Sequence, residues 1–206
     1  MSQFFHIHPD NPQGRLINQA VQIIRSGGII VYPTDSGYAI GCGLGEKKAM
    51  EKIVQIRQLN KKHNFTLVCR DLSEIASFAR IDNIAFRSVR AHTPGPYTFI
   101  FKGTKEVPKR VLNEKKKTIG IRIPDNSIAL ALLEELGEPL MSSSLLLPGD
   151  EFSESDPDEI RERLEKQVDL IIHGGYLGEK PTSVIDFSDG EPIVLREGEG
   201  DVSQFL

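Results

Sequence analysis

The sequence predicts a single α/β domain in which helices flank a twisted sheet of mixed parallel and antiparallel strands. Segments with helical spacing of apolar residues and segments of strand length are mixed along the whole chain, as in α/β proteins. The last three strand-like segments have no helix between them, so we do not expect a purely parallel sheet. With 206 residues and 39% hydrophobic residues, the chain can bury one core without disulfides.

Helices are predicted where apolar side chains recur every three or four residues between a capping residue and a stop signal. Asn11 followed by Pro12 is typical of a helix start, and Gly27 of a helix end. Asp156 followed by Pro157 opens a charged helix in the same way. The predicted helical segments are 11–27, 46–59, 73–92 (one helix or two), 126–136 and 156–167.

Strands are predicted from short apolar runs and from alternation of apolar residues. Pro33 ends the first run, and Ile119, Ile121 and Ile123 alternate with other residues in a later one. No change of composition marks a domain boundary, so we expect one domain over 1–206 with its core at about 11–198. The predicted strands are 29–32, 38–42, 65–69, 97–101, 118–123, 139–144, 168–172, 183–187 and 192–195.

The net charge of −4 hides a strong asymmetry along the chain. Residues 1–46 carry −1, residues 47–122 carry +12 and residues 123–206 carry −15. The basic middle third is either a solvated surface that pairs with the acidic third, or the lining of a cleft for phosphates or RNA. Charge alone favours the first interpretation and leaves the second open.

Several classes of protein are not indicated. The longest uncharged apolar runs are too short to cross a bilayer, and the N-terminus lacks a secretory signal. Cys42 and Cys69 do not form a disulfide framework, so a reducing cytoplasm is the expected location. No histidine has an acidic or cysteine partner at metal-ligand spacing, and His63 is isolated, so no metal site is predicted.

Two proline-containing segments place short polar side chains at the ends of predicted strands. Thr34, Asp35 and Ser36 follow the first strand, at the edge where α/β folds bind ligands. An ordinary turn has the same composition and remains an alternative. Residues 94–98 either leave Thr98 one face toward a ligand or form only a rigid entry into a strand.

Arg122 lies among the isoleucines of the strand at 118–123 and must reach water, an acid or a phosphate. Its planar guanidinium suits a phosphate, and a place on a solvated sheet face is the alternative. Ser142, Ser143 and Ser144 at a strand end can hold a phosphate or carboxylate. No G-x-S-x-G, Walker or G-x-G-x-x-G pattern is present, so a serine nucleophile is not expected.

Two basic clusters lie in predicted loops. They are Lys61 and Lys62, which precede His63, and the three lysines at 115–117. Contact with RNA is one interpretation, but few aromatic residues stand beside them for base stacking, which favours solvated loops.

Six segments, taken together, carry a resemblance over nearly the whole chain. They are 32–38 (YPTDSGY), 94–98 (PGPYT), 121–124 (IRIP), 139–144 (PLMSSS), 181–186 (PTSVID) and 195–198 (LREG). In this order and spacing they resemble the YrdC/YciO family, of the threonylcarbamoyl-AMP synthase type, and most of all its YciO branch. No single segment is decisive, whereas their order is specific.

The resemblance implies an α/β domain with a large basic concave surface. Members of the synthase type combine L-threonine, bicarbonate and ATP with Mg²⁺, release pyrophosphate and form threonylcarbamoyl-AMP for the modification of tRNA. The family is also linked to double-stranded RNA binding. No tightly bound cofactor is implied.

The resemblance also assigns site residues. The family's lysine corresponds to Arg57 and its serine to Ser144, which we take as catalytic candidates, while the family's arginine and asparagine are replaced by Leu59 and Leu146. Lys61 and Lys62 stand near enough in sequence to compensate. The residues expected to bind threonine or nucleotide are Thr34, Tyr38, Lys61, Lys62, Thr98, Arg122, Ser142, Ser183 and Arg196.

Three functions follow as alternatives. The first is a nucleotide- and RNA-binding family member whose synthase activity is weak or absent, because two polar groups are lost. The second is a working threonylcarbamoyl-AMP synthase that uses Arg57 with Lys61 or Lys62. The third is an RNA-binding protein without catalysis. Replacement by Leu59 and Leu146 also makes the pocket more apolar, which leaves another carbamoyl-type substrate open.

Overall fold

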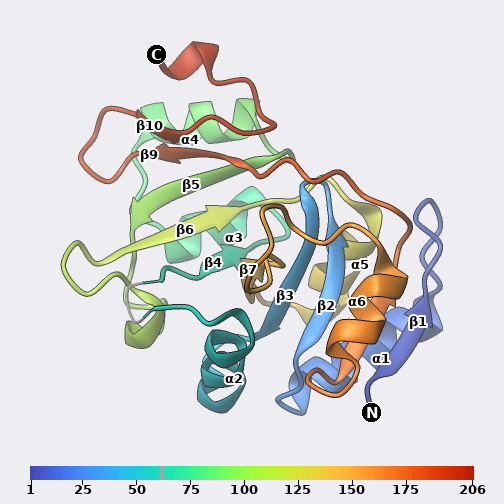
Figure 1. Cartoon of the computed structure of the whole chain (residues 1–206). Coiled ribbons are helices and arrows are strands. Elements are labelled where there is room, and N and C mark those ends of the chain that lie inside the picture. The colour runs from blue at the N-terminus through green and yellow to red at the C-terminus, as the bar shows by residue number, and fades with distance from the viewer. Residues whose placement is uncertain (61–62) are drawn as a thin grey trace.

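One ten-stranded sheet runs through the part of the chain that the computed structural model describes, residues 1–60 and 63–206 (Figure 1). The strand order across the sheet is β1-β8-β2-β3-β7-β4-β6-β5-β9-β10. Four neighbouring pairs are parallel and five are antiparallel, which confirms the predicted mixed sheet. The strands are β1 (Gln3–His6), β2 (Ile30–Thr34), β3 (Gly37–Gly43), β4 (Thr66–Val68), β5 (Tyr97–Lys102), β6 (Thr118–Arg122), β7 (Leu140–Ser144), β8 (Leu170–His173), β9 (Ser183–Asp186) and β10 (Ile193–Arg196).

The sheet is strongly twisted, as predicted. In Figure 1, β2 and β3 run nearly vertically while β5, β6 and β9 run across the view. Right-handed twist between neighbouring strands accumulates over many strands into such a change of direction.

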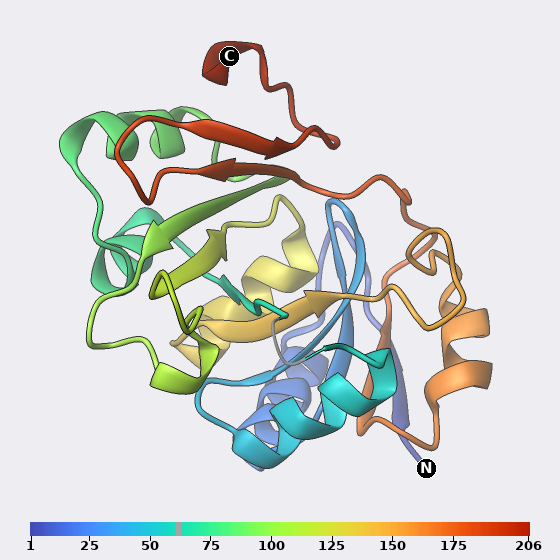
Figure 2. The ribbon, with the colours of Figure 1, turned by 60° about the vertical axis from the view of Figure 1, so that its left-hand side comes forward.

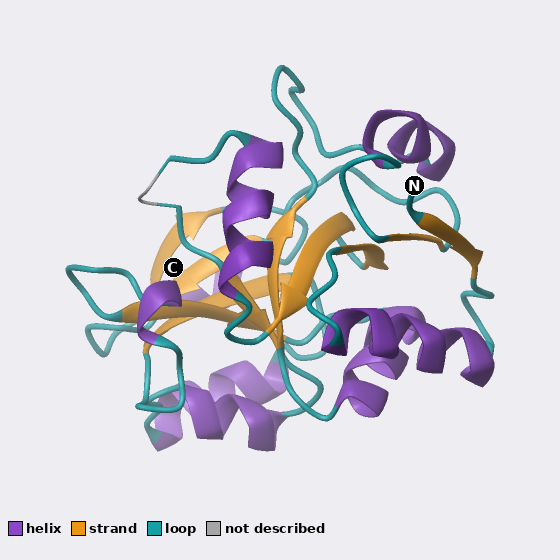
Figure 3. Cartoon of the chain, turned by 90° about the horizontal axis from the view of Figure 1, so that it is seen from below, coloured by secondary structure: helices purple, strands orange, loops and turns teal. Residues whose placement is uncertain are grey.

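Helices lie on both sides of the strands (Figure 3). In the described residues these are α1 (Gly14–Arg25), α2 (Lys47–Arg57), α3 (Leu72–Phe78), α4 (Asn83–Ala91), α5 (Ser127–Leu136) and α6 (Pro157–Leu164), with short 3₁₀ turns at Lys109–Val111 and Ser203–Phe205. No helix in these ranges is long and apolar enough to span a bilayer.

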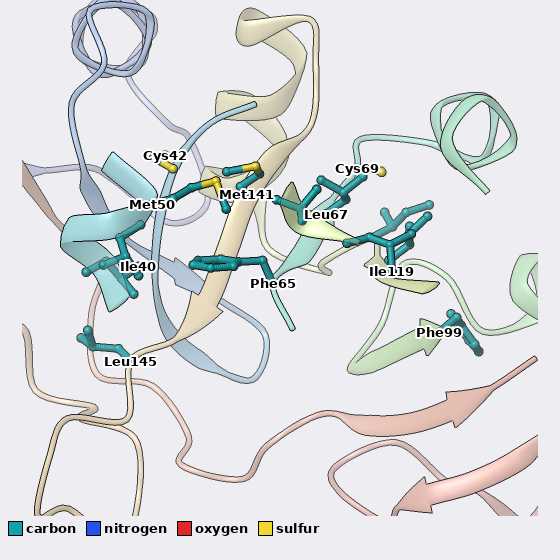
Figure 4. Packing of buried hydrophobic residues seen from close by; sticks show 14 of the residues in the cluster. Ile40, Cys42, Met50, Phe65, Leu67, Cys69, Phe99, Ile119, Met141 and Leu145 are labelled. Atoms are coloured by element: carbon teal, nitrogen blue, oxygen red, sulfur yellow. The ribbon is translucent and has the colours of Figure 1, made fainter. Parts of the chain in front are cut away.

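Two apolar clusters hold the layers together. In the smaller one, α1 and α5 pack on each other and on the sheet, with Val21, Ile24 and Leu132 almost fully buried. The larger one spans the rest of the sheet and includes Phe65 and Met141, which Figure 4 shows among its buried side chains. Both clusters reach central strands, so the strands that carry the polar segments are fixed by burial.

The capping signals were only partly correct. Asp156 accepts a hydrogen bond from the backbone N–H of Asp158 at 2.9 Å and caps α6, as predicted. Asn11 does not cap α1, because that helix begins at Gly14 after Gln13, whose side chain makes no capping hydrogen bond. The Gln13 side-chain oxygen accepts instead from the backbone N–H of His8, at 2.9 Å.

One strand was not predicted. The four-residue strand β1 pairs in parallel with β8 at one edge of the sheet. Its sequence QFFH shows neither clear alternation nor a long apolar run, so period-2 reasoning has nothing to detect.

Strand order brings the polar segments together. The late strand β7 lies between β3 and β4, and β6 and β5 follow. The turn between β2 and β3, the serines of β7, the start of β5 and the end of β6 therefore gather on neighbouring strands. Figure 2 shows β9 and β10 continuing the sheet beyond β5, with the C-terminal segment past them.

Candidate functional site

A cleft of about 760 Å³ opens on the sheet where these segments meet. Its wall comes from β5, β6, β9, the end of β7 and the loop between α2 and β4, and its rim from segments 151–153 and 179–182. The wall mixes hydroxyls with apolar side chains such as Ile100, Ile119 and Leu146. Such a cavity has the size and mixed lining of a small-molecule site.

Arg57, at the C-terminal end of α2, reaches across the cleft to the end of β7. Its Nε donates to the carbonyl oxygen of Leu146 at 3.0 Å, and its Nη1 donates to the Ser143 hydroxyl. Burial lowers the pKa of Arg57 from its ordinary value. The guanidinium thus presents one half-buried positive charge to the cleft while holding the chain that follows β7.

His63 shares the same hydroxyl. Its Nε2 lies 3.0 Å from Ser143 Oγ. Burial and the nearby positive charge of Arg57 lower the pKa of His63 to about 4, so the imidazole is neutral at pH 7. Sequence reasoning treated His63 as isolated and gave Ser143 no role beyond the serine run. Their contact joins residues 80 positions apart, which no local pattern reveals.

A second, much smaller pocket of about 40 Å³ adjoins the cleft. It is lined mainly by side-chain hydroxyls from β2, β3, β5, β7 and the segment before β9, together with Arg122. Both cavities are lined by Thr66, Thr98, Ser143, Ser144 and Thr182. The site therefore has two adjacent compartments, one large and partly apolar, the other small and polar.

Arg122 is buried beside the small pocket, with 7% of its side chain exposed. It forms an ion pair with Asp35 and donates to the Ser36 hydroxyl at 2.8 Å. Asp35 in turn accepts from the backbone N–H of Asp125, at 3.0 Å. The alternative of a solvated sheet face is therefore wrong for Arg122. Within the described residues its Nε is buried without a hydrogen-bond partner.

The predicted residues of β2 and β3 surround this pocket. Thr34 is buried and its hydroxyl donates to the carbonyl oxygen of Gly37 at 2.6 Å. Tyr38 also lines the pocket, but its hydroxyl donates to the carbonyl oxygen of Gly175 at 2.7 Å and accepts from the N–H of Gly174. Tyr38 therefore contributes its ring to the lining of the small pocket, while its hydroxyl is bonded to the backbone at Gly174 and Gly175.

Two serines of β7 have different surroundings. Ser142 is buried, and its hydroxyl lies 2.7 Å from the Tyr32 hydroxyl. Burial raises the pKa of Tyr32 to about 12, so this pair is neutral. Ser144 is exposed and lines both compartments. Ser144 therefore offers an accessible hydroxyl, whereas Ser142 lines the small pocket with a hydroxyl that is already engaged by Tyr32.

The predicted residues on β5, β9 and β10 separate into two groups. Thr98 and Arg196 meet at Thr182, whose hydroxyl lies 2.9 Å from Thr98 Oγ1 and 3.1 Å from Arg196 Nη2. Ser183, by contrast, is fully buried and lines neither compartment. Its hydroxyl donates to the carbonyl oxygen of Gly200 at 2.5 Å and accepts from a backbone N–H, so it fastens the C-terminal segment.

Lys61 and Lys62 lie outside the described residues. The described residues that line the large cleft include two arginines and two glutamates, Glu151 and Glu179. The +12 of the middle third is therefore not concentrated in this wall. The described part of the chain contains no group of three or more His, Cys, Asp or Glu side chains that could hold a metal ion.

Comparison with known proteins agrees with this architecture. The family model Sua5/YciO/YrdC, described as "Telomere recombination", matches residues 22–198. YciO of Escherichia coli K12 is 69% identical over the full length of both chains, and its crystal structure superimposes with a TM-score of 0.97.

More distant relatives carry functional names. The threonylcarbamoyl-AMP synthase of Coxiella burnetii is 31% identical over 87% of this chain and 96% of its own. P. abyssi Sua5, solved in complex with L-threonine, has a TM-score of 0.90 at 22% identity, over 98% of this chain and 59% of that one, which shows a shared fold. The expected family is thus confirmed: this chain belongs to the Sua5/YciO/YrdC family and is related to threonylcarbamoyl-AMP synthases.

Proposed function

We propose that the chain binds an adenine nucleotide in the large compartment together with a small acid, L-threonine or bicarbonate, whose carboxylate enters the small one. The observation that carries this proposal is the pairing of the two compartments, which share five wall residues and each contain an arginine. Arg122 lines the small pocket, where its guanidinium would attract the carboxylate of such an acid.

The chemistry of the named relative requires several negative charges to converge. In the reaction that the family resemblance implies, the threonine amine and bicarbonate form a carbamate, whose oxygen bonds to the α-phosphorus as the bond to pyrophosphate breaks. Arg57 and Arg196 would offset that charge, and the hydroxyls of Ser144 and Thr182 would orient the reactants. Magnesium would arrive on the phosphate oxygens of ATP, since it binds through few protein ligands.

We propose further that this synthase activity is weak. Leu59 and Leu146 supply neither the charge nor the amide of the family's pattern, and the Arg57 guanidinium is already bonded to Ser143 and to Leu146. One lost preorganised contact to the reacting group costs about 100-fold in rate. Two such losses cost up to about 10⁴-fold if they act independently.

The test is pyrophosphate release from ATP and Mg²⁺, with and without threonine and bicarbonate. We would compare the wild type, the double variant Leu59→Arg/Leu146→Asn and the matched control Leu59→Met/Leu146→Met. We expect little release in the wild type and in the control, and release that needs both small substrates in the first variant. Comparable release in the wild type would identify a working synthase, and silence in all three together with no ATP binding would refute the proposal.

We propose that the chain binds a second ligand, RNA, in the form of double-stranded RNA or tRNA. The lysine loop at 115–117 is tied to the wall of the cleft, because Asn113 Nδ2 donates to Asn64 Oδ1 at 3.4 Å. Asn113 also accepts from the backbone N–H groups of Lys115 and Lys116, which fixes the loop. Positive side chains on an ordered loop can track a phosphate backbone.

RNA affinity measured over a range of salt concentrations tests this. Lys115→Gln/Lys116→Gln should reduce the slope of log affinity against log salt by about 2, whereas the control Lys166→Gln in the acidic third should leave it unchanged. No measurable binding to RNA at low salt would refute it. We also propose a cytoplasmic setting, which is consistent with two buried free thiols, Cys42 and Cys69.

A further inference from the structure

Phe152 is an exposed aromatic side chain on the wall of the large compartment. Its side chain is 58% exposed, whereas Phe65, the other phenylalanine of that wall, is 5% exposed. Single exposed apolar residues are common on protein surfaces. This one differs because it lines the cleft and because its loop is held in place.

The loop that carries Phe152 is anchored on both sides. The backbone N–H of Glu154 donates to the carbonyl oxygen of Leu145 at 3.2 Å. Arg163 of α6 donates to both carboxylate oxygens of Asp150, at 2.7 and 3.2 Å, and to Glu154. The ring is therefore presented by a preorganised loop, which reduces the entropy lost when a ligand binds.

The charges around the ring define what it can contact. Glu151 adjoins Phe152, and Glu179 belongs to the same rim. The loops of both glutamates meet at Gly37, where a Cβ would lie 3.0 Å from the carbonyl oxygen of Gly178 and 3.8 Å from Ser153 Cβ. Two carboxylates disfavour phosphate at this end of the cleft. The phosphates of a ligand would be drawn instead to Arg57 and Arg196, the two arginines among the described residues of the cleft, which leaves an uncharged, flat group for Phe152.

We propose that Phe152 is the base platform of the cleft, a side chain whose ring stacks on the nucleobase of a free nucleotide. The inference rests on the proposed nucleotide binding and adds the part of the ligand that this rim recognises. A base that stacks on an aromatic side chain loses that contact when the ring is removed, so loss of the ring should weaken binding by about 10-fold.

Affinity measurements separate the ring from the phosphate contacts. We would measure binding of AMP and of ribose 5-phosphate to the wild type, Phe152→Leu and Phe152→Tyr by calorimetry. Phe152→Leu should bind AMP about 10-fold more weakly and ribose 5-phosphate as the wild type does, while Phe152→Tyr should retain AMP affinity. Unchanged AMP affinity in Phe152→Leu, or equal loss for both ligands, would overturn the assignment while leaving nucleotide binding intact.

The chain has no tryptophan, which allows a direct optical test. Phe152→Trp introduces a single indole at the cleft, and Ile84→Trp places one at a residue that is 79% exposed on α4 and lines neither compartment. AMP should quench the fluorescence of the first variant and not of the second. Quenching by an RNA duplex but not by AMP would contradict a free-nucleotide platform. Failure of the wild type to bind AMP at all would remove the proposed nucleotide function and this inference together.

Discussion

Replacing Asp35 with asparagine should leave the Arg122 guanidinium buried without its counter-charge. Only 7% of the Arg122 side chain and 12% of the Asp35 side chain are exposed. Removing one partner of a buried ion pair costs about 3–5 kcal/mol, because the other charge remains desolvated. Asparagine can still accept a hydrogen bond from Arg122, so we expect a value near the lower end, about 3 kcal/mol.

The companion variant Arg122→Met should cost less than Asp35→Asn. Asp35 would keep the hydrogen bond from the backbone N–H of Asp125. In the double variant neither charge is stranded, so the two losses should not add. We expect a coupling free energy of about 2 kcal/mol.

Urea unfolding followed by circular dichroism measures these differences. Thermal unfolding gives a second measure. For a chain of about 200 residues, a loss of about 3 kcal/mol in unfolding free energy corresponds to a fall in Tm of about 6–12 °C. Glu51→Gln is the control, since Glu51 pairs with Lys47 at 3.9 Å while both side chains are exposed, and it should change stability by less than about 0.5 kcal/mol. This prediction would be refuted if each single variant lost less than about 1 kcal/mol of unfolding free energy and the two losses simply added. The Arg122–Asp35 pair would then not be a buried, coupled ion pair.

Three further predictions concern other groups. His63 has a pKa of about 4 when folded and about 6.5 when unfolded, so the unfolded chain binds more protons between these values and stability falls as the pH drops through that window. Allowing for partial exposure, the wild type should lose about 1 kcal/mol more than His63→Gln between pH 7 and pH 5 in urea unfolding. Burial raises the pKa of the Cys42 thiol to about 12 and that of Cys69 well above its usual value, so neither should react with Ellman's reagent at about pH 8 until denaturant is added. Ser183→Ala should lower the free energy of unfolding by about 1–3 kcal/mol, because the Gly200 carbonyl loses its hydrogen-bond donor. Calorimetry should show unchanged nucleotide affinity. A loss of nucleotide affinity without a loss of stability would show that Ser183 belongs to the binding site.

Much of the fold could be predicted because local signals agree with burial. The predicted helix 126–136 is an example, since Gly137, which follows it, adopts the positive φ of 76° that glycine tolerates and so ends α5 at Leu136. The edge strand β1 was missed because four residues with partial exposure carry no periodic signal. Strand order could not be derived, because the position of β7 between β3 and β4 depends on pairing between distant segments.

Local patterns in the sequence pointed to some residues of the candidate site, and the family resemblance added others, but neither gave their contacts. Arg122 was singled out as a charge in a strand, but its partner Asp35 lies 87 residues away, so a solvated position remained open until the structure placed both. His63 was not predicted, since its relation to Ser143 exists only after α2 and β7 have packed. Ser183 matched a pattern, yet the folded chain uses its hydroxyl to fasten the C-terminal segment.

The place of β7 in the sheet has a consequence for synthesis on the ribosome. Strands β3 and β4 emerge early but are both bonded to β7, which ends only at Ser144. Until that strand emerges, a nascent chain holds two unpaired strand edges that invite association with other chains. Ribosome-bound fragments that stop before β7 should therefore engage chaperones more strongly than fragments that extend past it.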